Sequence, residues 1–356
     1  MVARVLCILG VIYIHLPPYT NEFPDPFLGA GGLFWFVRHG IGFASVPLLS
    51  AIAGYLAARP SPNASQGLQV RRKASSLLLP MILWNCIALC KDMAEHGMLP
   101  DPYVANILNQ IFALTDFPRV VPLYFLRDLF VCMLLTPLLI RCLKSQELLC
   151  LGLLLANAVF NLDGLLLLNS PIILFYSMGL AAASRPAPPD GGARPGFRHG
   201  LAVVATVGLS FLAEGLPGES PFAQEIRRSA FIANSLAVAM LFWALSRWLV
   251  STGRAARITC VEPIMFFVFC SHTLAIGLLW ALLRRAGVEP WSATYVAFFL
   301  VAPLVILAMC MAGGLIMSRL APGPSRILMG GRFPTFRELS SQSRRLFNRG
   351  QDIGRK

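Results

Sequence analysis

Two ionisable residues, Arg4 and His15, stand in an otherwise apolar stretch at the start of the chain. They are eleven positions apart. On an α-helix, residues at this spacing point in directions only about 20° apart and are separated by roughly 16 Å along the helix axis. We therefore expect both side chains on one face of one helix, three turns apart. A neutral imidazole can take a proton from a hydroxyl nucleophile and pass it to a leaving group. His15 is thus a candidate general base.

Five more ionisable residues lie within apolar segments, namely Arg38, His39, Arg127, Asp128 and His272. A charged side chain at the centre of a bilayer costs roughly 2.5–3.5 kcal/mol on insertion scales, so such groups persist where they face a polar cavity or one another. The sequence therefore predicts a polar cavity in the outer half of the membrane, formed by four helices.

Each of these residues also has a structural interpretation. His39 and His272 could satisfy a backbone carbonyl or a hydroxyl. Arg127 and Asp128 are adjacent, so their side chains should point about 100° apart and should not form a simple pair. One of the two could instead bind a neighbouring helix.

A basic cluster, Arg71, Arg72 and Lys73, is expected on the same side of the membrane as Arg4. Guanidinium forks match phosphate oxygens, so the cluster suits a phosphate-bearing donor. The alternative is that these charges only orient the protein in the membrane.

The composition indicates a polytopic all-α membrane protein. Hydrophobic residues make up 56% of the 356 positions, charged residues 13%, and the mean hydropathy is +0.66. We predict one transmembrane domain over 1–320 and a basic cytoplasmic tail over 321–356 that is disordered. The ten predicted spans are 3–18, 31–58, 74–91, 121–141, 146–161, 163–184, 199–213, 229–250, 262–283 and 292–318.

The basic residues explain the net charge of +13 through topology. With both termini in the cytoplasm, 22 Lys and Arg residues lie in inside segments and 6 in outside loops. We therefore expect no nucleic-acid partner, and a multi-pass protein of the inner (plasma) membrane in contact with lipid. The nine cysteines lack metal-ligand spacing, so no metal site is expected.

The longest outside loop, 92–120, contains apolar residues at helical spacing. They predict an amphipathic helix on the outer membrane face, either roofing a cavity or resting on lipid. These residues are Tyr103, Ile107, Leu108, Ile111 and Phe112.

Five motifs in this order resemble the membrane acyltransferase-3 family, the bacterial O-acyltransferases that decorate polysaccharides and lipopolysaccharides. The first is the basic residue, ten residues and His of the first helix, present here as Arg4 to His15. The others are VPLLSAIAGYL from Val46, RRKASSLLLPMILWN from Arg71, YFLRDLFV from Tyr124 and MFFVFCSH from Met265.

The resemblance implies a ten-helix fold that takes an acyl group, usually acetyl from acetyl-CoA, on the cytoplasmic side and delivers it to a sugar hydroxyl on the far side. His15 would be the essential catalytic residue, and Arg4 its partner in holding the donor or the acyl group. The acyl-CoA would be a donor substrate, with no permanently bound cofactor.

The chain departs from the family pattern at several positions. The Ser of the second-helix motif is Ala53, and the second basic position of the inner loop falls on Ser75 or Ser76. Tyr124 replaces a Trp, and Met265 and Phe269 replace a Ser and a Tyr. These departures leave open a weaker donor site, another acyl-CoA donor or a divergent member.

Two other functions fit the same features. A transporter or flippase of a glycolipid or small anion would also have ten spans and intramembrane charges, although Pro47 and Pro137 do not pair with Pro263 or Pro303 as internal repeats would require. A membrane scaffold that has lost activity is the third possibility. The acceptor glycan and the oligomeric state do not follow from the sequence.

Overall fold

The computed structural model describes residues 1–18, 29–58, 66–97, 103–164, 166–185, 196–218, 220–259 and 261–331. All regular structure in these ranges is helical, which confirms the predicted all-α class. The longer helices are α1 (Val2–Ile14), α3 (Ser45–Ala57), α5 (Leu79–His96), α7 (Tyr124–Phe160), α8 (Pro171–Ser184), α9 (Phe197–Glu214), α10 (Pro221–Ser251), α12 (Met265–Arg285) and α13 (Ala293–Leu320). The shorter elements are α2 (Gly29–Trp35), η1 (Phe36–Ile41), η2 (Gly42–Ala44), α4 (Gln66–Lys73), η3 (Ala74–Leu78), α6 (Val104–Phe112), η4 (Val121–Leu123), α11 (Ala255–Thr259), η5 (Glu262–Ile264) and α14 (Pro322–Leu328).

Six helical stretches in the described ranges are long and apolar enough to cross a bilayer. Two shorter apolar helices, α1 and α8, accompany them. The protein is thus a multi-pass membrane protein, and the count of ten spans remains a prediction. The six stretches are Gly31–Ala57, Val70–His96, Val121–Phe160, Pro221–Ser251, Glu262–Arg285 and Ala293–Leu320.

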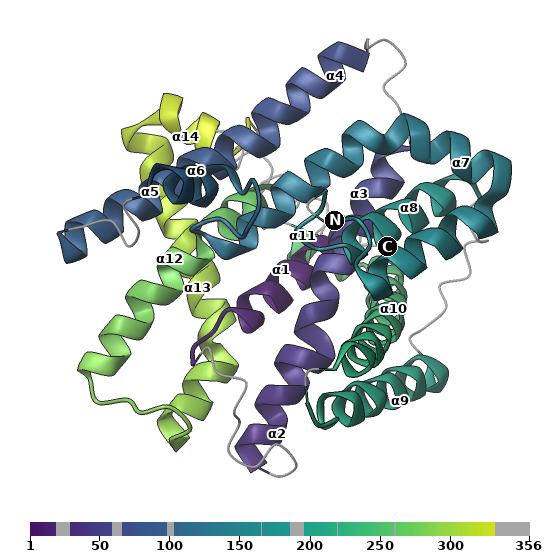
Figure 1. Ribbon diagram of the computed structural model, residues 1–356. Coiled ribbons are helices and arrows are strands. Elements are labelled where there is room, and N and C mark those ends of the chain that lie inside the picture. Colours follow the sequence, from purple (N-terminus) through teal and green to yellow (C-terminus); the bar gives the residue numbers. More distant parts are fainter. Residues whose placement is uncertain are drawn as a thin grey trace, which may run out of the picture.

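Helix α1 lies in the middle of the bundle. It contacts α3, α10, α12 and α13, and Figure 1 shows α12 and α13 on one side of it and α9 and α10 on the other. Its buried residues are distributed on all sides of the helix axis, as expected of a helix that is apolar all round. Whatever Arg4 and His15 contact must therefore come from neighbouring helices.

Helices α3 and α8 cross in close contact because each carries a glycine at the crossing. A Cβ on Gly54 would lie 1.9 Å from the Tyr176 carbonyl oxygen, and a Cβ on Gly179 would lie 2.0 Å from the Ala51 carbonyl oxygen. Small residues allow such close approach of helix backbones in membranes. Near this crossing the Tyr176 hydroxyl bonds Thr136 of α7 at 2.7 Å.

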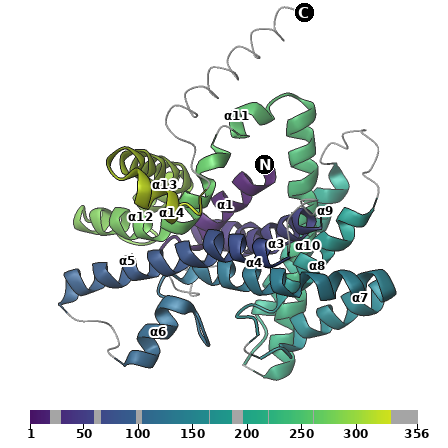
Figure 2. The same ribbon diagram turned by 90° about the horizontal axis from the view of Figure 1, so that it is seen from above.

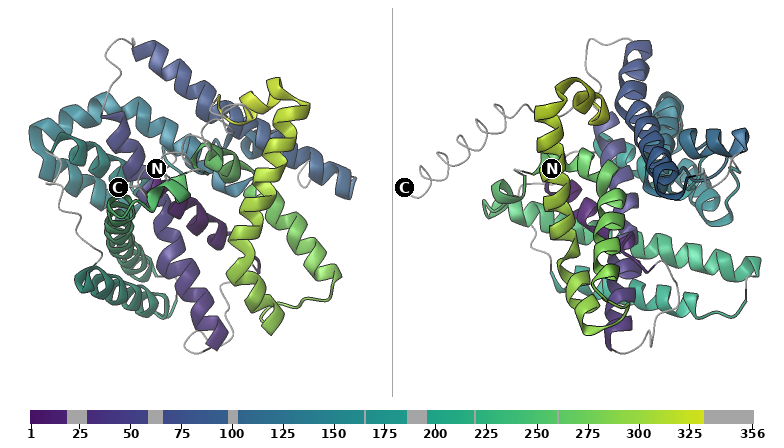
Figure 3. Two further views of the ribbon diagram at one scale, coloured as in Figure 1. Left: turned by 180° about the vertical axis from the view of Figure 1, so that it is seen from behind. Right: turned by 90° about the vertical axis from the view of Figure 1, so that its left-hand side faces the viewer.

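Helix α7 combines the predicted spans 121–141 and 146–161. Gln146 has non-helical torsion angles (φ −148°, ψ 76°), so the chain bends there, as Figure 3 shows. The predicted break at 141–147 therefore appears as a kink and not as a loop. Arg185, which follows α8, pairs with Glu147 beside the kink at 2.5 Å.

The predicted amphipathic helix of the 92–120 region is confirmed as α6. Figure 2 shows α6 standing apart from the bundle beside α5. Asn85 of α5 donates to the Ile111 carbonyl at 3.0 Å and accepts from the Val120 amide at 2.9 Å. Tyr103 and Val104 at the start of α6 are exposed.

The ordered chain extends past the predicted domain end at residue 320. Residues 322–328, which we expected in a disordered tail, form α14, and the Leu328 carbonyl accepts a hydrogen bond from Trp84 Nε1 at 3.2 Å. The tail boundary therefore has to be corrected, because apolar residues here pack on α5. The rest of the predicted tail, 332–356, lies outside the described residues.

Candidate active site

A cavity of about 720 Å³ opens between α1, α3, α4, α7 and the start of α12. Four charged residues line one part of it, namely Arg4, Arg72, Lys73 and Glu262. Most of its other lining residues are aliphatic or aromatic, including Phe125, Phe130, Phe266 and Phe269. Such a cavity suits a ligand with an anionic head and a less polar remainder.

Two residues of the basic cluster line the same cavity as Arg4. All three residues of the cluster are exposed; Arg72 and Lys73 line the cavity, and Arg71 is not a lining residue. Arg4 is ion-paired through Nη1 with Glu262 Oε1 at 2.7 Å. Glu262 was not predicted as a site residue, although a lone carboxylate at the inner end of the ninth predicted span, among basic segments, was a usable signal.

A second pair of residues meets at the far end of α1. The ring centroids of His15 and His272 are 5.4 Å apart. His272 is fully buried, and its Nδ1 lies 2.8 Å from the Phe269 carbonyl oxygen. That bond places the proton on Nδ1 and leaves Nε2 as a buried acceptor, which has no hydrogen-bond partner among the described residues. We call these two residues the histidine pair.

The segment that carries His15 is fixed from two sides. Buried Arg38 donates to the carbonyl oxygens of Ile14 and Pro18, both at 3.0 Å, and the Tyr295 hydroxyl of α13 donates to the Pro17 carbonyl. Arg38 lies in η1, a π-helical turn, a feature that often occurs at functional sites. Its role in the structure is to satisfy the carbonyl end of α1, next to His15.

His39 does not join the predicted cavity. Its Nδ1 lies 2.9 Å from Glu214 Oε1, and its ring stacks on Trp35, which donates to the same carboxylate. The expectation that His39 converges with the other groups was wrong, because adjacent residues on a helix point in different directions. His39 instead joins η1 to the end of α9.

Arg127 and Asp128 also differ from expectation. Arg127 Nη1 donates to Asp128 Oδ1 at 2.8 Å, so the prediction that the two should not form a simple pair was wrong. The long Arg side chain bends back to reach its neighbour. Arg127 also donates to the Leu166 carbonyl, and Asp128 accepts from the amides of Leu168 and Asn169. The two residues thus fasten the 166–169 segment and do not contact the histidine pair.

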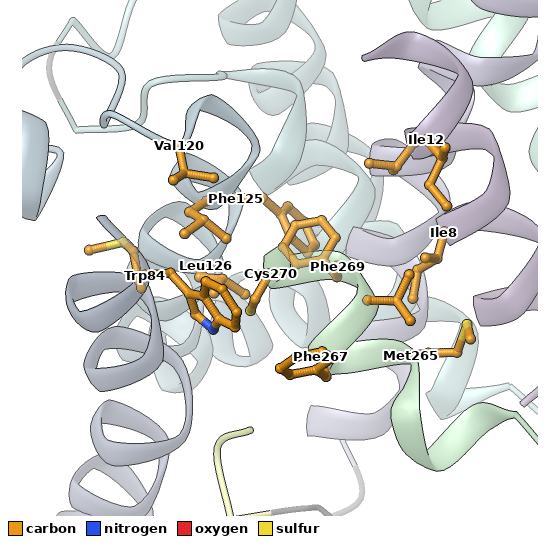
Figure 4. Packing of buried hydrophobic residues seen from close by; sticks show 14 of the residues in the cluster. Ile8, Ile12, Trp84, Val120, Phe125, Leu126, Met265, Phe267, Phe269 and Cys270 are labelled. Atoms are coloured by element: carbon orange, nitrogen blue, oxygen red, sulfur yellow. The ribbon is translucent and has the colours of Figure 1, made fainter. Parts of the chain in front are cut away.

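Two phenylalanines separate the cavity from the histidine pair. Phe269 lines the cavity, and its ring centroid is 5.8 Å from that of Phe125 and 6.1 Å from that of His272. Figure 4 shows the Phe125 and Phe269 rings side by side, facing Ile8 and Ile12 of α1. Arg4 and Ile8 line the cavity, while His15 is two turns beyond Ile8 and is not a lining residue. The cavity beside Arg4 is therefore separated from His15 by aromatic rings.

Comparison with known proteins identifies the class of this protein. The profile of an acyltransferase domain family matches residues 2–312, and the chain belongs to this family of membrane acyltransferases. It is similar to the succinoglycan biosynthesis protein ExoH of Rhizobium meliloti (strain 1021), with 31% identity over 352 residues, covering 92% of this chain and 90% of the relative. No solved structure matches the chain.

Proposed function

We propose that the protein is an O-acyltransferase of the inner membrane that moves an acyl group from a cytoplasmic acyl-CoA to a hydroxyl of an extracytoplasmic glycan. The family supports acyl transfer, and the relative's name supports a polysaccharide acceptor of the succinoglycan kind. The observation that carries the proposal is the cavity. Charged residues line one part of it and aromatic residues another, and one of these aromatic residues, Phe269, lies next to the histidine pair.

The charged part of the cavity suits the donor's phosphates. Arg4, Arg72 and Lys73 would bind them, and the thioester arm would extend along Ile8 towards Phe125 and Phe269. Acetyl is the acyl group that the family resemblance favours. For the acyl group to reach the histidine pair, the rings of Phe125 and Phe269 must move apart.

His15 would act as the general base of the transfer. Its imidazole takes the proton of the acceptor hydroxyl while that oxygen attacks the thioester carbonyl and forms a tetrahedral intermediate. The intermediate collapses by breaking the carbon–sulfur bond, and the leaving thiolate takes the proton back from His15. His272 would position His15, since its Nε2 is an acceptor beside that ring.

The test replaces each histidine with alanine and measures acyl transfer in lipid nanodiscs. His15→Ala should lower kcat by at least about 100-fold, the usual contribution of a general base. His272→Ala should lower kcat less, while His272→Asn retains part of the activity. The matched control is His96→Ala, because His96 is exposed at the end of α5. Full activity of His15→Ala would exclude the proposed chemistry.

A further inference from the structure

A second hollow, of about 320 Å³, lies where the end of α7, the start of α8 and α10 meet. Five of its lining residues have polar or aromatic side chains: Asn161, Asn169, Ser170, Arg228 and Phe231. They provide two amides, a hydroxyl, a guanidinium and one aromatic ring. The volume is near the lower limit of small-molecule sites, which span about 300–1,000 Å³.

Two of these side chains keep most of their hydrogen-bonding capacity. Among the described residues, Arg228 donates one hydrogen bond, to the Val159 carbonyl at 3.1 Å, out of the five N–H groups of a guanidinium. The Asn169 amide donates to the Tyr124 hydroxyl at 2.9 Å, which leaves a donor and the acceptor oxygen. A ligand in the hollow would find both donors and acceptors.

The hollow is held in shape before any ligand arrives. The Asp128 carboxylate accepts from the amides of Leu168 and Asn169 at 3.1 and 2.9 Å. The Ser170 hydroxyl lies 2.6 Å from both Asn161 Oδ1 and Asp163 Oδ1. Such a preorganised loop loses little further freedom on binding, so weak polar contacts can still give useful affinity.

The hollow is linked to the active site through the start of α7. Asn169 bonds Tyr124, and the next residue, Phe125, packs on Phe269 beside the histidine pair. Under the predicted topology, the 161–170 segment and Arg228 both face the extracytoplasmic side, where the acceptor is expected. A glycan that extends beyond one sugar ring could therefore occupy this hollow while another of its rings reacts.

We propose that this hollow binds a neutral sugar unit of the acceptor glycan. Sugar hydroxyls both donate and accept hydrogen bonds, which matches the amides, the hydroxyl and the guanidinium, and the C–H face of a pyranose matches the Phe231 ring. The Asp163 carboxylate, hydrogen-bonded to the lining residue Ser170, would repel an anionic group and so favours a neutral one. This inference rests on the proposed glycan acceptor.

The experiment measures acceptor binding and acceptor kinetics separately. The probe is the repeat oligosaccharide of succinoglycan, freed of its esters by alkali, added to protein in nanodiscs. Arg228→Gln should raise the KM for this oligosaccharide roughly tenfold with kcat unchanged, as expected for the loss of a hydrogen bond to a charged group. Arg228→Lys should restore part of the affinity, and Phe231→Ala should weaken binding independently.

The matched control is Arg285→Gln, the same change in charge at an exposed position at the end of α12, on the opposite side of the bundle (Figure 1). Calorimetric titration of the oligosaccharide in a His15→Ala background gives binding without turnover. Transfer by the unaltered protein with unchanged KM in Arg228→Gln and Phe231→Ala would overturn the sugar site alone. Absence of both binding and transfer in the unaltered protein would overturn the proposed function as well.

Discussion

Arg4 illustrates how one residue can serve a donor site while already having a partner. Its guanidinium is about one-third exposed and is paired with Glu262, which is 17% exposed, at 2.7 Å. An anionic donor that binds in the cavity must compete with this carboxylate or draw Arg4 away from it. Because the pair is partly exposed, the free energy gained by pairing Arg4 with Glu262 is expected to be about 0.2–1 kcal/mol. Glu262 would then tune donor affinity without blocking it.

Glu262→Gln should therefore lower the KM for the acyl-CoA donor by about 1.4- to fivefold, the factor that corresponds to that energy. Arg4→Gln should raise the same KM by about tenfold or more, because it removes a charge-assisted contact to phosphate. Initial rates at varied donor concentration in nanodiscs measure both effects. The control is Glu289→Gln, an exposed carboxylate in the loop after α12. Equal increases in KM for both cavity variants would show that Arg4 and Glu262 form only a structural unit.

At the scale of elements, the crossing of α3 and α8 sets one wall of the cavity. Ala53 and Ala57 of α3 line the cavity, and the α8 residue Tyr176 bonds Thr136, another lining residue. The close approach at Gly54 leaves no space for a methyl group, since the nearest atom is a backbone oxygen that cannot rotate away. The crossing thus depends on a short distance between two helix backbones.

Gly54→Ala should destabilise the protein by about 1–3 kcal/mol or more, because the helices must separate to admit the Cβ. The control is Gly277→Ala in α12, where an added Cβ meets nothing within 4 Å. That change should be neutral or stabilising by up to about 1 kcal/mol, through helix propensity. Thermal unfolding in detergent, followed by loss of the monodisperse peak, measures both. A lower melting temperature in Gly277→Ala than in Gly54→Ala would contradict this account.

Local sequence predicted the elements better than their contacts. Apolar periodicity located α6, and the apolar spans predicted the break near Gln146, because these signals depend on neighbours along the chain. The partners of His39 and Arg127 could not be predicted, since Glu214 and the Leu166 carbonyl are 175 and 39 positions away. The proximity of His15 to His272 was expected from topology, but the Phe125 and Phe269 rings between them and the cavity were not.

At the scale of the whole molecule, α7 decides the topology. A straight helix over Val121–Phe160, 40 residues, would be about 60 Å long, twice the thickness of a bilayer core. The kink at Gln146 allows two spans instead, and the Glu147–Arg185 pair joins the kink to the end of α8. Both features fit a turn at the cytoplasmic surface, where the excess of basic residues is also expected.

Reporter fusions along α7 test this arrangement. A fusion after Lys144 should give fluorescent GFP and inactive alkaline phosphatase, because this point is predicted to lie in the cytoplasm. A fusion after Leu114, in the segment after α6 that is predicted to lie outside, should give the opposite result and serves as the matched control. A fusion after Asn161 should again show active phosphatase, since the second half of α7 returns to the outside. Fluorescent GFP and inactive phosphatase after Asn161 would make Val121–Phe160 a single span, reverse every later segment, and place the hollow at Arg228 on the side away from the acceptor.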